Sequence, residues 1–329
     1  MKKILLVALL PILLIGCGEK SDGDGTGLTG VVRVDGSSTV FPITEAVGEE
    51  FQNLHRGVRV TVGISGTGGG FKKFMVGETD INDASRPIKG KEINKAAENG
   101  IEFVEIPVAF DGLSVLVNPA NDWVDYMTIE ELHMIWQPGS TVKTWKDVRP
   151  SWPDRPLTLY GPDVDSGTFD YFTEVVNGKS QVCRPDYTAS ADDNVLVTGI
   201  SGDQNSLGYF GFAYYEENRD KLRLVPIDGG KGPVSPSVET INNGSYAPLS
   251  RPLFIYVAKD AAARPEIQAF VKFYLDNAAA LSAEVGYVGL PDEAYGLAMA
   301  RFTDLKTGTV FNSDKAKSGK HDIVDILKW

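Results

Sequence analysis

Strand patterns and helix patterns alternate along the chain from one end to the other, and this alternation limits the folds that it can adopt. Apolar and polar side chains alternate in residues 58–64, which predicts a strand. Ile43, Val47 and Phe51 repeat at helical spacing behind Pro42, which suits the first turn of a helix. Further strand-like runs occur at 101–108, 113–117, 157–160, 207–212, 222–227 and 253–258. The pattern predicts an α/β protein with mostly parallel sheets.

Two of these apolar strands, at 113–117 and 253–257, are candidates for the points at which the chain crosses between domains. A chain of 329 residues is long enough for two domains of ordinary size. The segment between the two strands can fold as one unit, and the outer segments then combine into the other. We therefore predict lobe 1 from residues 28–112 and 250–329, and lobe 2 from residues 113–249.

The N-terminus has the features of an export signal. Lys2 and Lys3 precede an apolar run, residues 4–15, of the length expected of a signal peptide and too short to span a membrane comfortably. The segment Leu14-Ile15-Gly16-Cys17 resembles the bacterial lipobox. We expect residues 1–16 to be removed, Cys17 to be lipidated, and residues 17–27 to form a flexible tether. A signal peptide with a chance cysteine is the alternative.

Charge and cysteine content narrow the classes of partner. The formal net charge is −12, and removal of Lys2 and Lys3 with the signal peptide changes it to −14. Such an acidic protein is not expected to bind nucleic acid or anionic lipid as its main partner. With Cys17 lipidated, only Cys183 remains, so no intrachain disulfide is possible. No cluster of residues has metal-ligand spacing, and we expect neither a metal nor another cofactor.

Three predicted strand-to-helix junctions are rich in glycine and hydroxyl side chains, at 34–42, 63–71 and 161–172. At a helix N-terminus, unpaired N–H groups and the helix dipole favour an anion, and hydroxyl groups add donors. Hydroxyl residues at helix starts are also common as simple caps, but three such junctions in one α/β chain favour a binding site. Their glycine and hydroxyl residues include Ser38, Thr39, Ser65, Thr67, Ser166, Gly167 and Thr168.

Charged residues lie close to these junctions. Ser85 and Arg86 lie in the stretch 80–88, where Pro87 favours an extended conformation of Arg86, and an arginine presents a planar fork of donors suited to a tetrahedral oxyanion. Arg184 is a second candidate cation, or a plain surface residue. Asp163, Asp165 and Asp170, in contrast, crowd the third junction. They are either solvated residues at a helix start, or acceptors for a proton that the anion carries.

Six stretches of the sequence, taken in order, resemble the phosphate-binding proteins of bacterial ABC phosphate importers. The resemblance implies a two-lobed periplasmic-binding-protein fold of type II, with mixed sheets flanked by helices and phosphate in the cleft between the lobes. Carried over by position, it implies these phosphate contacts: Ser38, Thr39, Ser65 or Thr67, Ser85, Arg86, Ser166, Gly167 and Thr168. It also implies a monomer that delivers phosphate to membrane subunits from the periplasm or the outer cell surface. The stretches are DGSSTVFP, ISGTGGGF, DINDASRPI, DSGTFDYF, SADDNVLVTGI and LGYFGFAYYEEN.

The chain departs from the best-known form of this family at two positions. Some family members have an arginine where this chain has Pro162, and an acidic residue where it has Arg86. We therefore expect Arg86 to be the cation of the site. Asp165, with Asp163 as the reserve, is expected to accept the phosphate proton. Sulfate carries no such proton at neutral pH, so a carboxylate in the site would reject it.

Two other kinds of function remain as alternatives. Ser166 could belong to a phosphatase or a hydrolase, but no G-x-S-x-G motif surrounds it, and none of the three histidines neighbours a candidate nucleophile in a recognisable pattern. We therefore do not expect an enzyme. The same fold could also serve a sensor, or bind another tetrahedral oxyanion such as arsenate.

Overall fold

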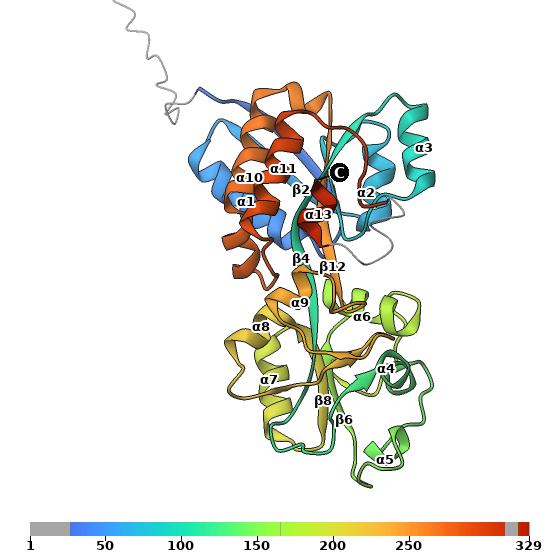
Figure 1. Cartoon of the computed structure of the whole chain (residues 1–329). Coiled ribbons are helices and arrows are strands. Elements are labelled where there is room, and N and C mark those ends of the chain that lie inside the picture. The colour runs from blue at the N-terminus through green and yellow to red at the C-terminus, as the bar shows by residue number, and fades with distance from the viewer. Residues whose placement is uncertain (1–26, 165, 313–321, 329) are drawn as a thin grey trace, which may run out of the picture.

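The computed structural model describes residues 27–164, 166–312 and 322–328. It forms an upper and a lower body joined by long strands (Figure 1). The upper body contains β1 (Gly30–Gly36), α1 (Phe41–Leu54), β2 (Val58–Ile64), α2 (Gly66–Phe74), β3 (Ile81–Ala84), α3 (Gly90–Glu98), η1 (Ala261–Ala263), α10 (Pro265–Glu284), α11 (Asp292–Thr303) and α13 (Ile323–Leu327).

The connecting strands are β4 (Phe103–Val117) and β12 (Ser250–Ala258). The rest of the chain forms the lower body, in which short strands and helices alternate (Figure 1). Its elements are β5 (Met127–Thr128), α4 (Ile129–Trp136), α5 (Trp145–Val148), β6 (Thr158–Pro162), α6 (Gly167–Asn177), β7 (Thr188–Ser190), α7 (Asp193–Gly202), β8 (Ser206–Gly211), α8 (Phe212–Glu217), β9 (Arg223–Leu224), β10 (Ile227–Asp228), β11 (Pro233–Val234) and α9 (Val238–Asn242).

One mixed sheet runs through both bodies, in the order β2-β1-β3-β12-β4-β8-β6-β7, with β9 beside β4. The outer pairs are parallel, as expected for strands connected through helices. The central pairs of β12 with β3 and β4, and of β4 with β8, are antiparallel, so the sheet is less parallel than predicted. In the upper body, α1, α10 and α11 lie on one side, and α2 and α3 on the other (Figure 1).

The strand β4 corrects the prediction of two separate strands at 101–108 and 113–117. It is one strand of 15 residues, and every one of its residues is buried. The chain does not turn between the two apolar runs, and residues 109–112 continue the antiparallel ladder with residues 250–253 of β12. Residues Phe103–Gly112 pair with β12, whereas Leu113–Val117 pair with β8. We propose that this change of partner marks the boundary between lobe 1 (28–112 and 250–329) and lobe 2 (113–249).

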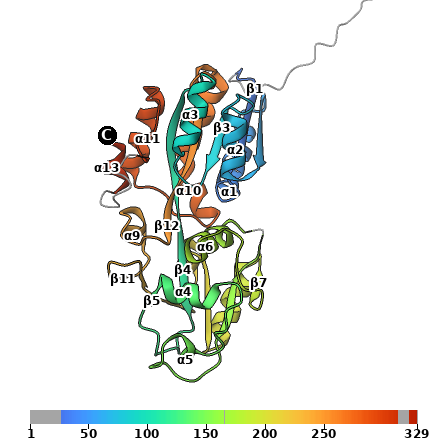
Figure 2. The same cartoon turned by 90° about the vertical axis from the view of Figure 1, so that its right-hand side faces the viewer.

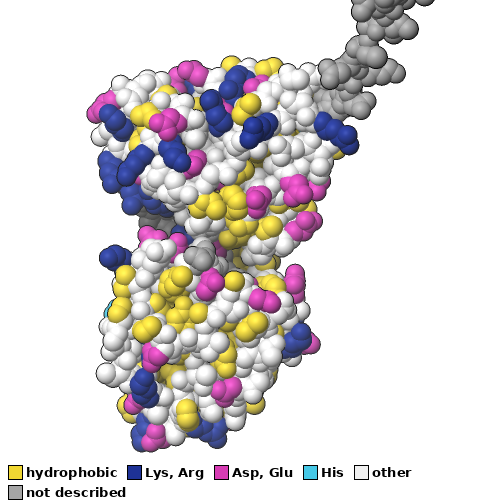
Figure 3. All heavy atoms as spheres, turned by 180° about the vertical axis from the view of Figure 1, so that it is seen from behind, with side chains coloured by type: hydrophobic (Ala, Val, Ile, Leu, Met, Phe, Trp, Pro, Cys, Tyr) yellow, Lys and Arg dark blue, Asp and Glu magenta, His cyan; other side chains and the backbone are white. Residues whose placement is uncertain are grey.

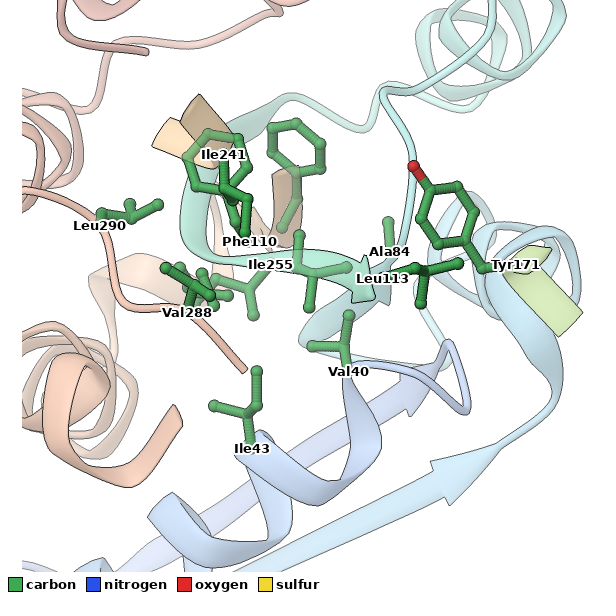
Figure 4. Close-up of a cluster of buried hydrophobic side chains, with 14 of the residues drawn as sticks. Val40, Ile43, Ala84, Phe110, Leu113, Tyr171, Ile241, Ile255, Val288 and Leu290 are labelled. Atoms are coloured by element: carbon green, nitrogen blue, oxygen red, sulfur yellow. The ribbon is translucent and has the colours of Figure 1, made fainter. Parts of the chain in front are cut away.

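The hydrophobic core continues from one body into the other. Figure 4 shows Val40, which directly precedes α1, Ile43 of α1 and Ile255 of β12 beside Leu113 of β4 and Tyr171 of α6. All of these side chains are buried. The side view in Figure 2 shows that α6 lies directly below the upper body. The start of α6 therefore faces the ends of the upper strands.

Candidate anion-binding site

A polar pocket lies where the upper strands end and α6 begins. Because β1 lies between β2 and β3 and is parallel to both, the segments that follow the three strands meet at one edge of the sheet. Together with the first turns of α6 and with β12, they surround a cavity of about 170 Å³. Its lining residues are Ser37, Ser38, Thr39, Gly66, Thr67, Ser85, Arg86, Asp170, Glu174, Ser180 and Arg251.

Hydrogen bonds within lobe 1 fix the hydroxyl groups of the pocket. The N–H group of Ser85 donates to Thr67 Oγ1 at 3.1 Å, and the hydroxyl oxygens of these two residues also lie 3.1 Å apart. The N–H group of Thr39 donates to Ser37 Oγ at 3.2 Å. The contacts of Ser85 tie the loop after β3 to the start of α2, and the contact of Thr39 lies within the loop after β1. The donors around the cavity are therefore positioned before any ligand enters.

Two glycines allow close approaches that the pocket requires. Gly36 ends β1 with φ of +151°, and a Cβ atom there would lie 2.2 Å from the carbonyl oxygen of Asp83. Gly167 begins α6, and a Cβ atom there would lie 2.7 Å from Thr39 Oγ1. A side chain at either position would push neighbouring backbone apart. Gly167 is thus the point at which the lower body touches the loop after β1.

Arg251 of β12 is the most buried of the described arginines that line the pocket. Its Nη2 atom donates to Thr39 Oγ1 at 3.2 Å, and its Nε and Nη2 atoms donate to Asp111 Oδ2 at 3.3 and 3.2 Å. Its guanidinium carbon lies 3.7 Å from the centre of the Tyr171 ring. Burial raises the pKa of Asp111, although the charge of Arg251 opposes this shift. Arg251 therefore contacts residues of both bodies at the back of the pocket.

Arg86, the predicted cation, also lines the pocket but is already paired. Its two terminal nitrogens donate to the carboxylate of Glu92 at 2.9 and 2.8 Å. Although burial opposes the shift, hydrogen bonds from Arg86 and from the backbone of Lys89 lower the pKa of Glu92. The side chain is 25% exposed, and it also lies over the Phe71 ring. Glu92 therefore holds Arg86 at the rim as a fixed cation.

The lower body contributes carboxylates to the pocket. Asp170 lies in the first turn of α6, and its Oδ1 atom is buried with no hydrogen-bond partner among the described residues. Glu174 lies one turn further along, where its side chain is 60% exposed and one oxygen is 4.0 Å from Arg251 Nη1. A buried carboxylate oxygen without a donor is unusual. Asp170 therefore presents an unused acceptor beside a cluster of donors.

Of the predicted site residues, Ser38, Thr39, Thr67, Ser85 and Arg86 line the pocket. The other predicted serine, threonine and glycine residues do not line the pocket and make other contacts. The hydroxyl group of Ser65 donates to Asp35. Ser166 caps α6 by accepting from the N–H group of Thr168 at 3.2 Å, and Gly167 packs on Thr39. Ser166, Gly167 and Thr168 thus form the start of α6 beside the pocket rather than its lining.

The structure does not place Asp163 or Arg184, two of the predicted charged site residues, in the lining of the pocket. Asp165 lies outside the described residues. Asp163 does not line the pocket, and its N–H group donates to the carbonyl of Ser190 at 3.2 Å. Arg184 also lies outside it, because its guanidinium group is buried in the lower body against Asp186 and the carbonyl of Ile135. These contacts make Arg184 a structural residue of lobe 2.

Sequence reasoning considered Asp170 but did not select it, and it missed Ser37, Gly66, Glu174, Ser180 and Arg251; one signal could have found Arg251. The tripeptide Ser-Arg-Pro occurs at 85–87 and again at 250–252. Both copies lie at the edge of the sheet where the pocket is formed, and both arginines line the cavity. Asp170 was visible as an acid in the first turn of a helix, a position usually explained by the helix dipole alone.

No group of three or more histidine, cysteine or acidic residues could hold a metal ion among residues 27–164, 166–312 and 322–328. Within those same residues, no helix combines the length and the apolar character that crossing a membrane requires.

Comparison with known proteins places the chain in a family. Residues 22–278 match the model of the PBP superfamily domain. Protein SphX of Synechocystis sp. is 50% identical over 286 residues, which cover 86% of this chain and 85% of that protein. The phosphate-binding protein PstS of Staphylococcus epidermidis is 40% identical over 316 residues, covering 94% of this chain and 93% of that protein.

Similarity to a solved structure indicates the same family as these relatives do. The crystal structure of a possible phosphate-binding protein from Planctomyces limnophilus is 49% identical, with a TM-score of 0.81 over 84% of this chain and 99% of that chain. The match confirms the expected two-lobed, mixed α/β fold of type II. The chain therefore belongs to the PBP superfamily and, within it, to the PstS family of phosphate-binding proteins.

Proposed function

We propose that the protein binds inorganic phosphate in this pocket and delivers it to the membrane subunits of an ABC-type importer. The observation that carries the proposal is the combination of fixed donors and one unused acceptor. Hydroxyl groups from three loops and two arginines converge on the cavity, and Asp170 adds a buried oxygen without a donor. The names of the relatives support the same ligand.

Asp170 gives this pocket a way to distinguish phosphate from sulfate. At neutral pH phosphate carries at least one O–H group, which can donate to the free Oδ1 atom of Asp170. Sulfate has no proton to donate, so its oxygen would face the carboxylate and leave both groups unsatisfied. Asp170 thereby takes the role that the sequence suggested for Asp165 or Asp163, because Asp170 lines the described pocket and Asp163 does not.

The proposal is tested by Asp170→Asn, measured by calorimetry with phosphate and with sulfate. The variant loses the acceptor and gains an amide that can donate. We expect phosphate to bind about 5- to 200-fold more weakly, which corresponds to the ~1–3 kcal/mol of one unsatisfied buried polar contact. Sulfate binding should become measurable.

Asp165→Asn and Glu174→Gln are the matched controls, since each removes one negative charge close to α6. If Asp165→Asn alone changes the preference between the two anions, Asp165 is the acceptor and Asp170 is not. If all three variants bind phosphate as the unmodified protein does, no carboxylate of α6 recognises the phosphate proton.

The location of the protein forms part of the proposal. Lys2 and Lys3, the apolar run 4–15 and Cys17 support export followed by lipidation, which would hold the binding lobes at the outer face of a membrane. We expect mass spectrometry of the mature protein to find acyl groups on an N-terminal Cys17. A mature N-terminus downstream of Cys17 without acyl groups would contradict a lipid anchor.

A melting-temperature screen with different anions, together with an assay for ester hydrolysis, distinguishes phosphate binding from the other ligands and activities. Arsenate has the shape and protons of phosphate, so it should raise the melting temperature as phosphate does, whereas sulfate and molybdate should not. A model phosphate ester should release no free phosphate, because the pocket offers binding groups rather than a recognisable nucleophile and base. Release that depends on Ser166 would instead indicate a hydrolase.

A further inference from the structure

A second hollow lies on lobe 1 directly beside the pocket, and positive charge dominates it. The hollow has a volume of about 620 Å³ and includes Lys72 of α2 and Lys91 and Lys95 of α3. Arg86 lines both this hollow and the anion pocket, so the two cavities are adjacent. We call these four residues the basic face. In the reverse view of Figure 3, dark-blue side chains gather on the upper body where α2 and α3 lie.

The charges of the basic face are available to solvent. Lys72, Lys91 and Lys95 are all exposed. Lys95 pairs with Glu98 at 3.1 Å in a contact in which both side chains are largely exposed, and such surface pairs neutralise little of the local field. Glu92 offsets Arg86. The three lysines therefore supply the net positive charge of this surface.

The positive charge of this surface is opposite in sign to the net charge of the whole chain. The formal net charge of the chain is −12, and Asp170 and Glu174 add negative charge at the pocket itself. Negative net charge of this kind disfavours the approach of an anion. Charges act over about 8 Å at physiological ionic strength, and the basic face begins at the pocket, because Arg86 lines both cavities.

We propose that the basic face is an electrostatic collecting surface, which attracts the anionic ligand and guides it into the adjacent pocket. This inference rests on the proposed function, because it concerns the route by which phosphate reaches that site. The lysines do not line the pocket, so they act on the approach of the anion rather than on the bound complex. Steering of this kind raises association rates by about 10- to 1000-fold and falls steeply with salt.

The test is the triple variant Lys72→Gln, Lys91→Gln, Lys95→Gln. Dissociation is measured by chasing bound radiolabelled phosphate with unlabelled phosphate, and the dissociation constant by equilibrium dialysis with the same label. Their ratio gives the association rate constant. At low ionic strength we expect association to slow about 10-fold while dissociation changes less than about twofold, and near 0.5 M salt the difference should vanish.

A matched control removes the same charge far from the pocket. Lys143, Lys146 and Lys221 are exposed in lobe 2, and their replacement by glutamine should leave association within about twofold of the unmodified protein. An equal slowing in the control would show an effect of net charge alone and overturn the proposal. Faster dissociation in the first variant would do the same, because it would place the lysines in contact with bound phosphate.

Two further outcomes distinguish failure of the collecting role from failure of the proposed function. If the basic-face variant binds phosphate at normal rates but no longer associates with importer membrane subunits in vesicles, the face is a docking surface and the collecting role is wrong. If the unmodified protein does not bind phosphate at all, the proposed function fails before the collecting role arises.

Discussion

At the scale of single residues, Arg251 is the side chain on which the pocket depends most. It joins Thr39 of one lobe to Tyr171 of the other, and it neutralises the buried Asp111. An anion in the pocket would complete the hydrogen bonding of its guanidinium group. Arg86 has the same chemistry but lies at the more exposed rim.

We predict that Arg251→Ala weakens phosphate binding more than Arg86→Ala does. Removal of one partner of a buried charged contact costs about 2–5 kcal/mol, which is roughly 30-fold to several thousand-fold in the dissociation constant. Calorimetry measures the change. Arg251→Lys should recover only part of it, because lysine keeps the charge without the planar fork of donors.

Arg155→Ala serves as a control for loss of an arginine, since Arg155 packs on Trp123 in lobe 2 and does not line the pocket. A loss under threefold for Arg251→Ala, with a larger loss for Arg86→Ala, would return the main role to the cation that the sequence indicated.

The arginines also show how far the site could be predicted. The hydroxyl loops were found because strand, glycine and serine or threonine follow one another locally along the chain. Arg86 was predicted as the cation because it lies close to these loops, whereas the proline after Arg251 does not distinguish it, because Arg149, Arg155, Arg184 and Arg264 also precede a proline. Only the pairing of β12 with β4 places one of them, Arg251, beside Asp111. That contact depends on tertiary structure.

At the scale of an element, the short strand β3 carries an acid into the core. Asp83 is fully buried, and burial raises its pKa to about 8. The charge of Asp35 acts in the same direction. A hydrogen bond with the Thr44 side chain acts in the opposite direction, but burial outweighs it. The folded protein therefore holds a proton there that the unfolded chain releases at much lower pH.

This shift predicts a pH dependence of stability. A carboxyl group with a raised pKa in the folded state stabilises the protein below its unfolded pKa, and this contribution is lost as pH rises toward about 8. Asp83→Asn removes the ionisation while keeping the shape. We expect the variant to lose less stability than the unmodified protein between pH 5 and pH 8, by about 2–4 kcal/mol.

Denaturant unfolding at pH 5, 6, 7 and 8 checks this difference. Asp193, whose pKa burial raises to about 6, also contributes to the dependence in the unmodified protein, so only the difference between the two proteins is diagnostic. Parallel pH curves for the two proteins would show that Asp83 does not titrate in this range.

At the scale of the whole molecule, the two lobes meet at the pocket and are joined by β4 and β12. The contact of Gly167 with Thr39 brings the start of α6 against the loop after β1. We predict that phosphate favours this closed arrangement by a hinge movement of the lobes. Small-angle scattering should show a smaller radius of gyration with phosphate than without it, and no change with sulfate.

Two glycine variants test whether contact between the lobes is needed for closure. Gly167→Ala places a methyl group against Thr39 and should keep the protein more open in the presence of phosphate. Gly296→Ala, within α11, meets no atom within 4 Å and should close as the unmodified protein does. If scattering is identical with and without saturating phosphate in the unmodified protein, the pocket is rigid.

The position of β12 also determines the order in which the molecule can be assembled. This strand lies between β3 and β4, although it comes more than a hundred residues after both in the chain. As the polypeptide emerges from its N-terminus onward, the sheet of lobe 1 stays interrupted until residue 250 and those beyond it are available. All strands of lobe 2 have emerged by then. A chain cut short before β12 would thus have an intact lower half and an upper half that lacks its central strand.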